Sequence, residues 1–231
     1  MIGTIVNTCT IVLGSAIGAA AKKGLGKKYQ DVLFLAMGLA AVGIGVHGVV
    51  VGMSDSKYPV LFIASLAIGG VVGTALDING RFDRFVSNRA KDGGSLAQGL
   101  STAIMIFCIG ALSILGPINS ALYGDETYLL TNATLDFVTS MVLASTFGFG
   151  IAFAAVVLFC WQGSIWLLAN LIAPYLSDAL MCEITIVGGF LILASGLAIL
   201  KIKDIPTMNL LPAILVPPIW FAILEIAKLF S

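Results

Sequence analysis

One carboxylate stands out among the few polar side chains in the apolar stretches of this chain. Asp136 occurs in the run TLDFVTS, and Thr139 and Ser140 follow it three and four residues later. At those spacings the three side chains share one face of an α-helix, so one carboxylate and two hydroxyls would lie together. Such a set suits a dehydrated small cation, a proton relay or an ammonium group. The alternative is that Asp136 only marks the outer end of a span, where a negative charge suits a helix N-terminus.

Polar residues in two other segments could join Asp136. Asn7 and Thr8 lie in the apolar N-terminal stretch, and Asn209 lies at the start of the last apolar stretch. Polar groups at membrane depth are costly and usually face a cavity or a partner helix. We therefore predict a polar site near the membrane midplane that binds a small solute or ion. Its predicted residues are Asn7, Thr8, Asp136, Thr139, Ser140 and Asn209.

The remaining reactive residue types form no catalytic or metal-binding pattern. His47 is the one histidine, and the four cysteines (Cys9, Cys108, Cys160 and Cys182) are scattered without a CxxC spacing. Apolar packing is the expected role of the thiols. The sequence contains no HExxH, no GxSxG and no glycine-rich loop that ends in Lys-Ser or Lys-Thr. We expect no enzyme activity, no metal site and no cofactor.

The amino-acid composition indicates that the predicted site residues lie in membrane-spanning helices. Of 231 residues, 59% are hydrophobic and 10% are charged, whereas a soluble domain has about 25% charged residues. The mean hydropathy is +1.06. Twelve basic and twelve acidic residues cancel, so there is no basic field to attract nucleic acid. We predict an all-α fold, a polytopic bundle of transmembrane helices whose surroundings are the lipid bilayer.

Charged residues divide the chain into about eight apolar spans, since about 20 residues are needed to cross a bilayer core of roughly 30 Å. The 41 residues between Asp136 and Asp178 carry no charge. Two spans joined by a tight turn near residues 159–164 are expected there, and a re-entrant segment is the alternative. The expected spans are residues 1–21, 32–54 and 58–76, one within 93–124, two within 137–177, then 184–200 and 205–224.

Basic residues give the expected orientation, because short loops rich in Lys and Arg stay in the cytoplasm. Ten of the twelve follow the first, third or seventh span, and only Lys57 and Lys228 face the other way. We expect a multi-pass membrane protein with both termini outside the cytoplasm.

Prolines are concentrated near the last span, where Pro206, Pro212, Pro217 and Pro218 occur. A proline removes a backbone donor and clashes with the preceding turn of a helix. We therefore expect the last span to be kinked or broken, with its freed carbonyl groups satisfied by neighbouring groups.

Residues 1–231 are expected to form a single transmembrane domain that contains two related units. Glycines recur seven residues apart in MGLAAVGIG, at Gly38 and Gly45, and in GGFLILASG, at Gly189 and Gly196. These two spans run in opposite directions, so residues 1–92 and 159–231 would form an inverted repeat around spans four and five. Inverted repeats are typical of secondary transporters. The alternative is chance similarity between glycine-rich helices.

Six segments together resemble one protein family over essentially the full chain. They are GTIVN (3–7), GLAAVGIG (38–45), YGD (123–125), LDFVTSMVLASTFGFG (135–150), VGGFLILASGL (187–197) and MNLLPA (208–213). The chain resembles the YqgA/YdfK family of bacterial multi-pass inner-membrane proteins, a domain of unknown function. The resemblance implies a fold and a location in the bacterial cytoplasmic (inner) membrane, and it implies no substrate or mechanism.

A polar site inside a helix bundle favours a membrane transporter of a small solute or ion. In one alternative, an ion channel, the same residues would line a continuous wet pore. In the other, a scaffold or sensor, glycine-rich faces would bind another membrane protein. These faces also permit a homo-oligomer, although packing within one chain explains them equally well.

Overall fold

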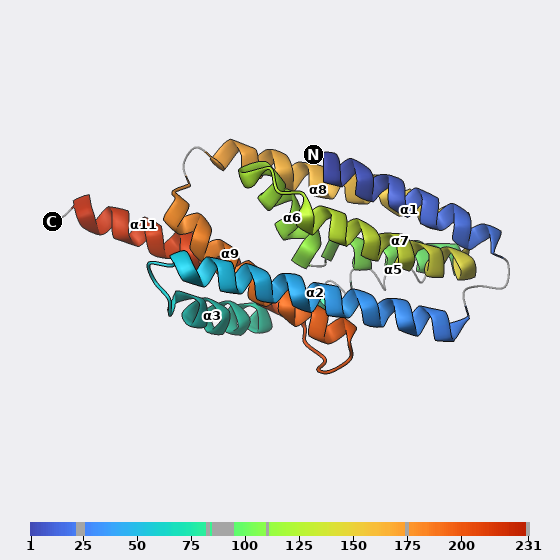
Figure 1. Ribbon diagram of the computed structural model, residues 1–231, viewed down its shortest axis with the longest axis horizontal. Helices are drawn as coiled ribbons and strands as arrows, with labels where there is room; N and C mark the ends of the chain where they lie inside the picture. Colours follow the sequence, from blue (N-terminus) through green and yellow to red (C-terminus); the bar gives the residue numbers. More distant parts are fainter. Residues whose placement is uncertain (22–25, 82–83, 85–94, 110, 174–175, 230–231) are drawn as a thin grey trace. The chain divides into compact units, whose positions relative to one another are not determined.

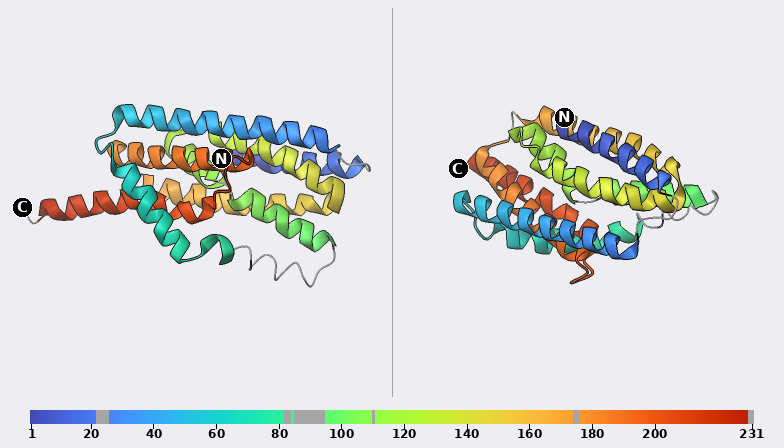
Figure 2. Two further views of the ribbon diagram at one scale, coloured as in Figure 1. Left: turned by 90° about the horizontal axis from the view of Figure 1, so that it is seen from below. Right: turned by 45° about the vertical axis from the view of Figure 1, so that its right-hand side comes forward.

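The computed structural model describes the chain except for residues 22–25, 82–83, 85–94, 110, 174–175 and 230–231. The described residues form α-helices, short 3-10 helices and connections, without a β-strand (Figures 1 and 2). The all-α prediction is therefore confirmed. The start of the fourth expected span and most of the basic stretch 81–91 lie outside the described residues.

Several expected spans are divided between two or three elements (Figure 1). In chain order the elements are α1 (Ile2–Ala20), α2 (Lys27–Asp55), α3 (Leu61–Ala75), α5 (Ser95–Ile109), α6 (Ala111–Tyr123), α7 (Thr127–Phe147), η1 (Phe149–Phe153), α8 (Ala154–Ile172), α9 (Asp178–Ile199), α10 (Thr207–Leu210), η3 (Leu211–Leu215) and α11 (Val216–Leu229).

Five helical segments of the described chain are long and apolar enough to cross a membrane. The bent pair α5 and α6, which meet at 42°, raises the number to six. Helix α3 has 15 residues, or about 22 Å, which is short for a span of about 30 Å. Helix α7 has 21 residues, but polar side chains interrupt its apolar sequence. The expected number of about eight spans is thus not confirmed.

The predicted turn at residues 159–164 is wrong. Helix α8 runs without interruption through this stretch. The break comes earlier, at Gly148, which has a φ of +86° and is followed by the 3-10 helix η1. A positive φ is readily adopted by glycine, which has no Cβ. The prediction of a broken last span agrees with the structure, where α10, η3 and α11 follow one another and Pro212 lies in η3.

The chain forms two compact units. Unit 1 contains Met1–Met37 and Arg81–Pro174, and unit 2 contains Gly38–Gly80 and Tyr175–Ser231. Unit 1 therefore holds α1, α5, α6, α7, η1 and α8. Unit 2 holds most of α2 together with α3, α9, α10, η3 and α11. Each unit joins segments that are far apart in the sequence.

In unit 1, helices α1 and α7 pack in parallel through glycines. A Cβ at Gly14 would meet the carbonyl group of Phe137, and a Cβ at Gly18 would meet that of Met141. The contacts advance in the same direction along both helices. Small residues at this spacing let two helix backbones approach closely.

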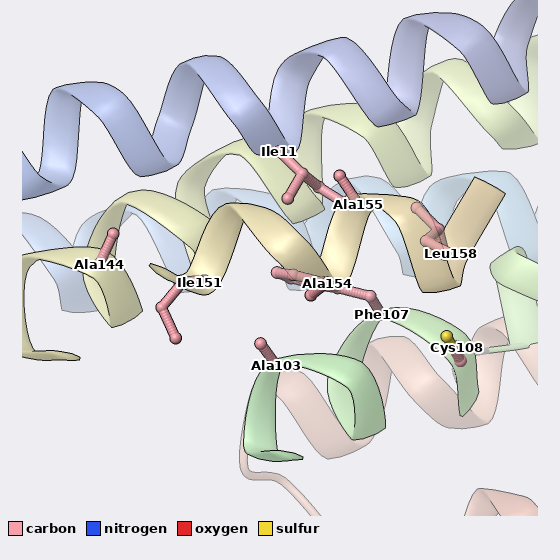
Figure 3. Packing of buried hydrophobic residues seen from close by; sticks show 9 residues of the cluster. All are labelled: Ile11, Ala103, Phe107, Cys108, Ala144, Ile151, Ala154, Ala155 and Leu158. Atoms are coloured by element: carbon pink, nitrogen blue, oxygen red, sulfur yellow. The ribbon is translucent and has the colours of Figure 1, made fainter. Parts of the chain in front are cut away.

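The apolar core of unit 1 extends from this helix pair to α5, η1 and α8 (Figure 3). Ile11 of α1 lies near Ala155 of α8, and Phe107 of α5 lies near Ala154 (Figure 3). Both Ile11 and Phe107 are fully buried. This packing fixes the face of α1 that is turned toward its neighbours.

In unit 2, helices α2 and α9 pack in antiparallel directions through the glycines that the sequence comparison singled out. A Cβ at Gly45 would meet Leu193 and Gly189, and a Cβ at Gly189 would meet Val49 and Gly45. At Gly196 a Cβ would meet the carbonyl group of Gly38. The similar glycine spacing of the two segments is therefore explained by their direct contact. The inverted repeat stays a prediction.

Candidate functional site

Asp136 lies in the middle of α7. It is the tenth of the 21 residues that run from Thr127 to Phe147, about 14 Å along the axis from the helix start. The interpretation of Asp136 as the outer end of a span is therefore wrong, because the helix N-terminus is too far away to stabilise its charge. The helix begins earlier than the apolar pattern suggested.

Two side-chain amides hold the Asp136 carboxylate. Asn7 Nδ2 of α1 and Asn132 Nδ2 of α7 each donate a hydrogen bond of 2.9 Å to Asp136 Oδ2. The exposed fractions are 0% for Asn7, 5% for Asn132 and 3% for Asp136. The structure thus brings together Asn7 and Asp136, which are 129 residues apart in the sequence.

No basic side chain neutralises this carboxylate within the described residues. The nearest acidic residue on the preceding turns of α7 that has a cationic partner is Glu126, which pairs with the Met1 ammonium at 3.3 Å at the start of the helix. Transfer of an unpaired carboxylate out of water costs several kcal/mol even after local relaxation. Buried charges in proteins are therefore usually paired or bound to a cation. Two neutral amides provide hydrogen bonds to Asp136 but no positive charge.

Three oxygen atoms on α1 lack a hydrogen-bond partner among the described residues. They are Thr4 Oγ1, Asn7 Oδ1 and Ser15 Oγ, and all three residues have an exposed fraction of 0%. Thr4 lies three residues before Asn7 and shares its face of the helix. A buried polar atom without a partner is uncommon and costs about 1–3 kcal/mol.

The other predicted residues of unit 1 lie close to this cluster in the sequence. Thr8 Oγ1 donates to the carbonyl oxygen of Thr4 at 2.8 Å, and Ser140 Oγ donates to that of Phe137 at 2.8 Å. Both hydroxyl protons are therefore used within their own helices. Thr139 is buried. These three side chains lie on the same two helices as Asn7 and Asp136, but they make no hydrogen bond with Asp136.

The structure places Asn209 in unit 2, whereas the other five predicted site residues belong to unit 1. Its Oδ1 accepts a hydrogen bond of 2.9 Å from the backbone N–H of Asn79. Its own carbonyl oxygen is the atom that a Cβ at Gly73 would meet. Asn209 therefore joins α10 to the chain that follows α3.

In each unit a backbone N–H at or just before the start of a helix donates to a glutamate. Gly3 N–H donates to Glu126 at 3.1 Å, and Tyr58 N–H donates to Glu183 at 3.1 Å. Four residues after these donors come Asn7 in α1 and Phe62 in α3. The glycine pairs Gly14 and Gly18 in α1 and Gly69 and Gly73 in α3 follow these donors at equal spacing in the sequence.

The contacts that follow differ between the two units. In unit 1, Asn7 meets Asp136, ten residues after Glu126. In unit 2, Phe62 of α3 stacks on Phe190 of α9, seven residues after Glu183, with ring centroids 4.8 Å apart. The glycine pair of α3 faces α10 and η3, whereas that of α1 faces α7.

Two residues of these clusters were absent from the predicted site. Asn132 lies four residues before Asp136, and this spacing alone places it on the same helix face. Glu183 has an exposed fraction of 1%, and its Oε1 accepts from Ser56 Oγ at 2.7 Å as well as from Tyr58. Its signal in the sequence was weak, because a charge beside an apolar stretch resembles the end of a span.

The helices and the buried acidic cluster define a class, the polytopic α-helical membrane proteins. Comparison with known families gives the particular family. A model described as "Protein of unknown function (DUF554)" matches residues 2–222, and the chain belongs to this family.

Two relatives agree with this assignment. The chain is 57% identical over 219 residues to "Uncharacterized membrane protein YdfK" of Bacillus subtilis (strain 168), and these residues make up 95% of each of the two chains. It is 29% identical over 224 residues to "Uncharacterized protein YqgA" of Escherichia coli (strain K12), which covers 93% of this chain and 94% of the relative. No solved structure matches. The resemblance to the YqgA/YdfK family is confirmed.

Proposed function

We propose that this protein is a carrier that moves a small solute or ion across the bacterial cytoplasmic membrane through a site at Asp136. The observation that carries the proposal is a carboxylate, 3% exposed, in the middle of α7, held by two amides and without a basic partner among the described residues. A ligand with positive charge, or a proton, would supply what the two amides do not. The proposal assigns the protein transport and no catalytic activity.

The cost of burying Asp136 supports a functional role for it. A buried carboxylate without a basic partner costs several kcal/mol even after local relaxation, and an apolar residue at this position would avoid that cost. Helix packing alone therefore gives no reason for Asp136.

The burial of the site favours a carrier over a channel. Thr4 and Asn7 have exposed fractions of 0%, as expected for an occluded site and not for a wet pore. The breaks at Gly148 and around Pro212 provide support of another kind, since discontinuous helices are common in secondary transporters. A scaffold or sensor would need neither feature.

A ligand screen tests the proposal. Purified protein in detergent is heated with amino acids, amines, organic acids, and monovalent and divalent cations, and the apparent melting temperature is recorded. A ligand at a hundred times its Kd stabilises the native state by about 2.7 kcal/mol. Compounds that shift the wild type but not Asp136→Asn are then tested for counterflow in proteoliposomes. The proposal fails if no compound depends on Asp136, or if every such compound binds without counterflow.

Asp136→Asn is a suitable variant because the fold should tolerate it. The asparagine oxygen can accept from both Asn7 and Asn132, so neither amide loses its partner. A variant with wild-type helicity and no ligand response therefore reports on the site. Asn170, which is exposed on α8, provides a matched control as Asn170→Asp, and this variant should keep the ligand response.

A further inference from the structure

The unpartnered atoms around Asp136 indicate which class of ligand the site would take. Thr4 Oγ1 and Asn7 Oδ1 are both oxygen atoms, and both belong to residues with an exposed fraction of 0%. Asn7 Oδ1 belongs to the same amide whose nitrogen donates to Asp136. Thr4 lies one turn earlier on the same face, with its Cβ about 5–6 Å from that of Asn7.

One oxygen of the Asp136 carboxylate receives no hydrogen bond from either amide. Asn7 and Asn132 both donate to Oδ2 of Asp136, and neither donates to Oδ1. Together with Thr4 Oγ1 and Asn7 Oδ1, this gives a set of oxygen atoms that carries one negative charge. Oxygen sets bind hard cations, whereas sulfur and imidazole favour zinc and copper.

Charge and burial narrow the class further. One carboxylate balances a single positive charge, and sites for Ca²⁺ and Mg²⁺ usually contain more than one carboxylate or a phosphate. The exposed fractions of Thr4, Asn7 and Asp136 are 0–3%, so an ion bound there would exchange its hydration water for protein oxygen atoms, and Mg²⁺ gives up its water reluctantly. We infer that the Asp136 site binds a dehydrated alkali-metal cation. This inference rests on the proposed function and names the ligand of the same site.

Binding of ²²Na⁺ to purified protein in detergent tests the inference, with KCl, RbCl, NH₄Cl and choline chloride as competitors at equal ionic strength. The wild type should bind one ion per chain in a saturable way. K⁺ or Rb⁺ should compete, whereas choline should not. Asp136→Asn should abolish binding.

Thr4→Val provides the sharpest variant. Because Thr4 Oγ1 has no partner, its replacement by a methyl group of similar shape should leave the protein without sodium as stable as before, or more stable. Its affinity for sodium should fall by at least roughly tenfold, as when a metal site loses a supporting group. A purely structural role for Thr4 would not reduce sodium affinity.

Ser15→Ala is the matched control. Ser15 lies on the same helix, is buried at 0% exposure and also has an unpartnered Oγ, but it lies 11 residues beyond Thr4, about 16 Å along the axis. This variant should bind sodium like the wild type. Equal losses in Thr4→Val and Ser15→Ala would overturn the inference, because the effect would then not be local to the site.

Other outcomes separate the inference from the proposed function. If no alkali cation binds but counterflow of a screened solute still depends on Asp136, the inference fails and the carrier stands. Binding of ammonium alone, or stabilisation by acid without any response to alkali cations, also overturns the inference. Saturable sodium binding without any counterflow supports the cation site and refutes the carrier.

Discussion

The hydrogen bond between Asn7 and Asp136 predicts a measurable coupling between two helices. We consider the double-mutant cycle Asn7→Leu, Asp136→Leu and the double variant, because leucine is close in size to both residues. Asn7→Leu leaves the carboxylate with Asn132 as its remaining amide donor, whereas Asp136→Leu leaves both amides unpaired. The double variant leaves a single unpaired amide. It should therefore be less destabilised than the sum of the two single variants.

The size of the coupling follows from the kind of bond. Hydrogen bonds to charged groups contribute about 1.5–3 kcal/mol in soluble proteins, and hydrogen bonds between membrane helices average about 0.6 kcal/mol with a maximum near 1.7. For a buried 2.9 Å bond to a carboxylate, we expect a coupling of about 1–2 kcal/mol. In a chain of this length that corresponds to about 2–8 °C in melting temperature.

Intrinsic tryptophan fluorescence during heating, at one scan rate and in one detergent, measures the four melting temperatures. Circular dichroism checks that each variant is helical before heating. Additivity within about 0.5 kcal/mol would refute the reasoning, because residues that do not interact behave in this way. The cycle Phe62→Leu and Phe190→Leu in unit 2 is the control, with an expected coupling of about 0.5–1.5 kcal/mol from the stacked rings.

Three further predictions use the same melting assay. Gly18→Ala should destabilise the protein by about 1–3 kcal/mol, because the new Cβ would meet the carbonyl group of Met141. Gly43→Ala, whose Cβ would have no atom within 4 Å, should be neutral or stabilising. Equal effects of the two substitutions would contradict the packing of α1 on α7. Gly148→Ala should destabilise by about 1–2 kcal/mol through its positive φ, and an unchanged melting temperature would argue against the break there. Glu183→Leu should destabilise by about 2 kcal/mol or more, because the Ser56 hydroxyl loses its acceptor and the Tyr58 N–H keeps Ser56 Oγ as its one remaining acceptor. Glu183→Gln should cost less, and the reverse order would refute this role of Glu183.

Much of the fold could be predicted from where charges interrupt apolar sequence. The expected spans 1–21 and 32–54 correspond to α1 at Ile2–Ala20 and to α2 at Lys27–Asp55. The method works because an uncharged stretch of about 20 residues has few other uses. It gave no information within residues 137–177, where no charge occurs. There the break depends on the backbone conformation of Gly148, which hydropathy does not report.

The candidate site could be predicted in part. Asn7 and Asp136 were selected because polar groups at membrane depth are costly, and the structure places them in contact. The sequence did not indicate that they are partners, because 129 residues separate them and a parallel helix pair leaves no pattern in either helix alone. It also grouped Asn209 with them, although Asn209 belongs to the other unit. Composition identifies polar residues but not the tertiary contacts that sort them into sites.

The start of α7 was missed for a physical reason that also bears on its role. A helix that faces lipid must be apolar on most of its surface, whereas a helix surrounded by protein can carry polar groups that meet one another. Helix α7 contacts α1, α5, α6 and η1, and it does not count among the five long apolar segments. High mean hydropathy therefore identifies helices that face lipid, whereas the spacing of charged residues identifies only the stretches that carry no charge. Helix α7 is long but not apolar enough to be identified by its hydropathy, because its polar side chains meet other parts of the protein. A site for a polar ligand is expected on such a helix.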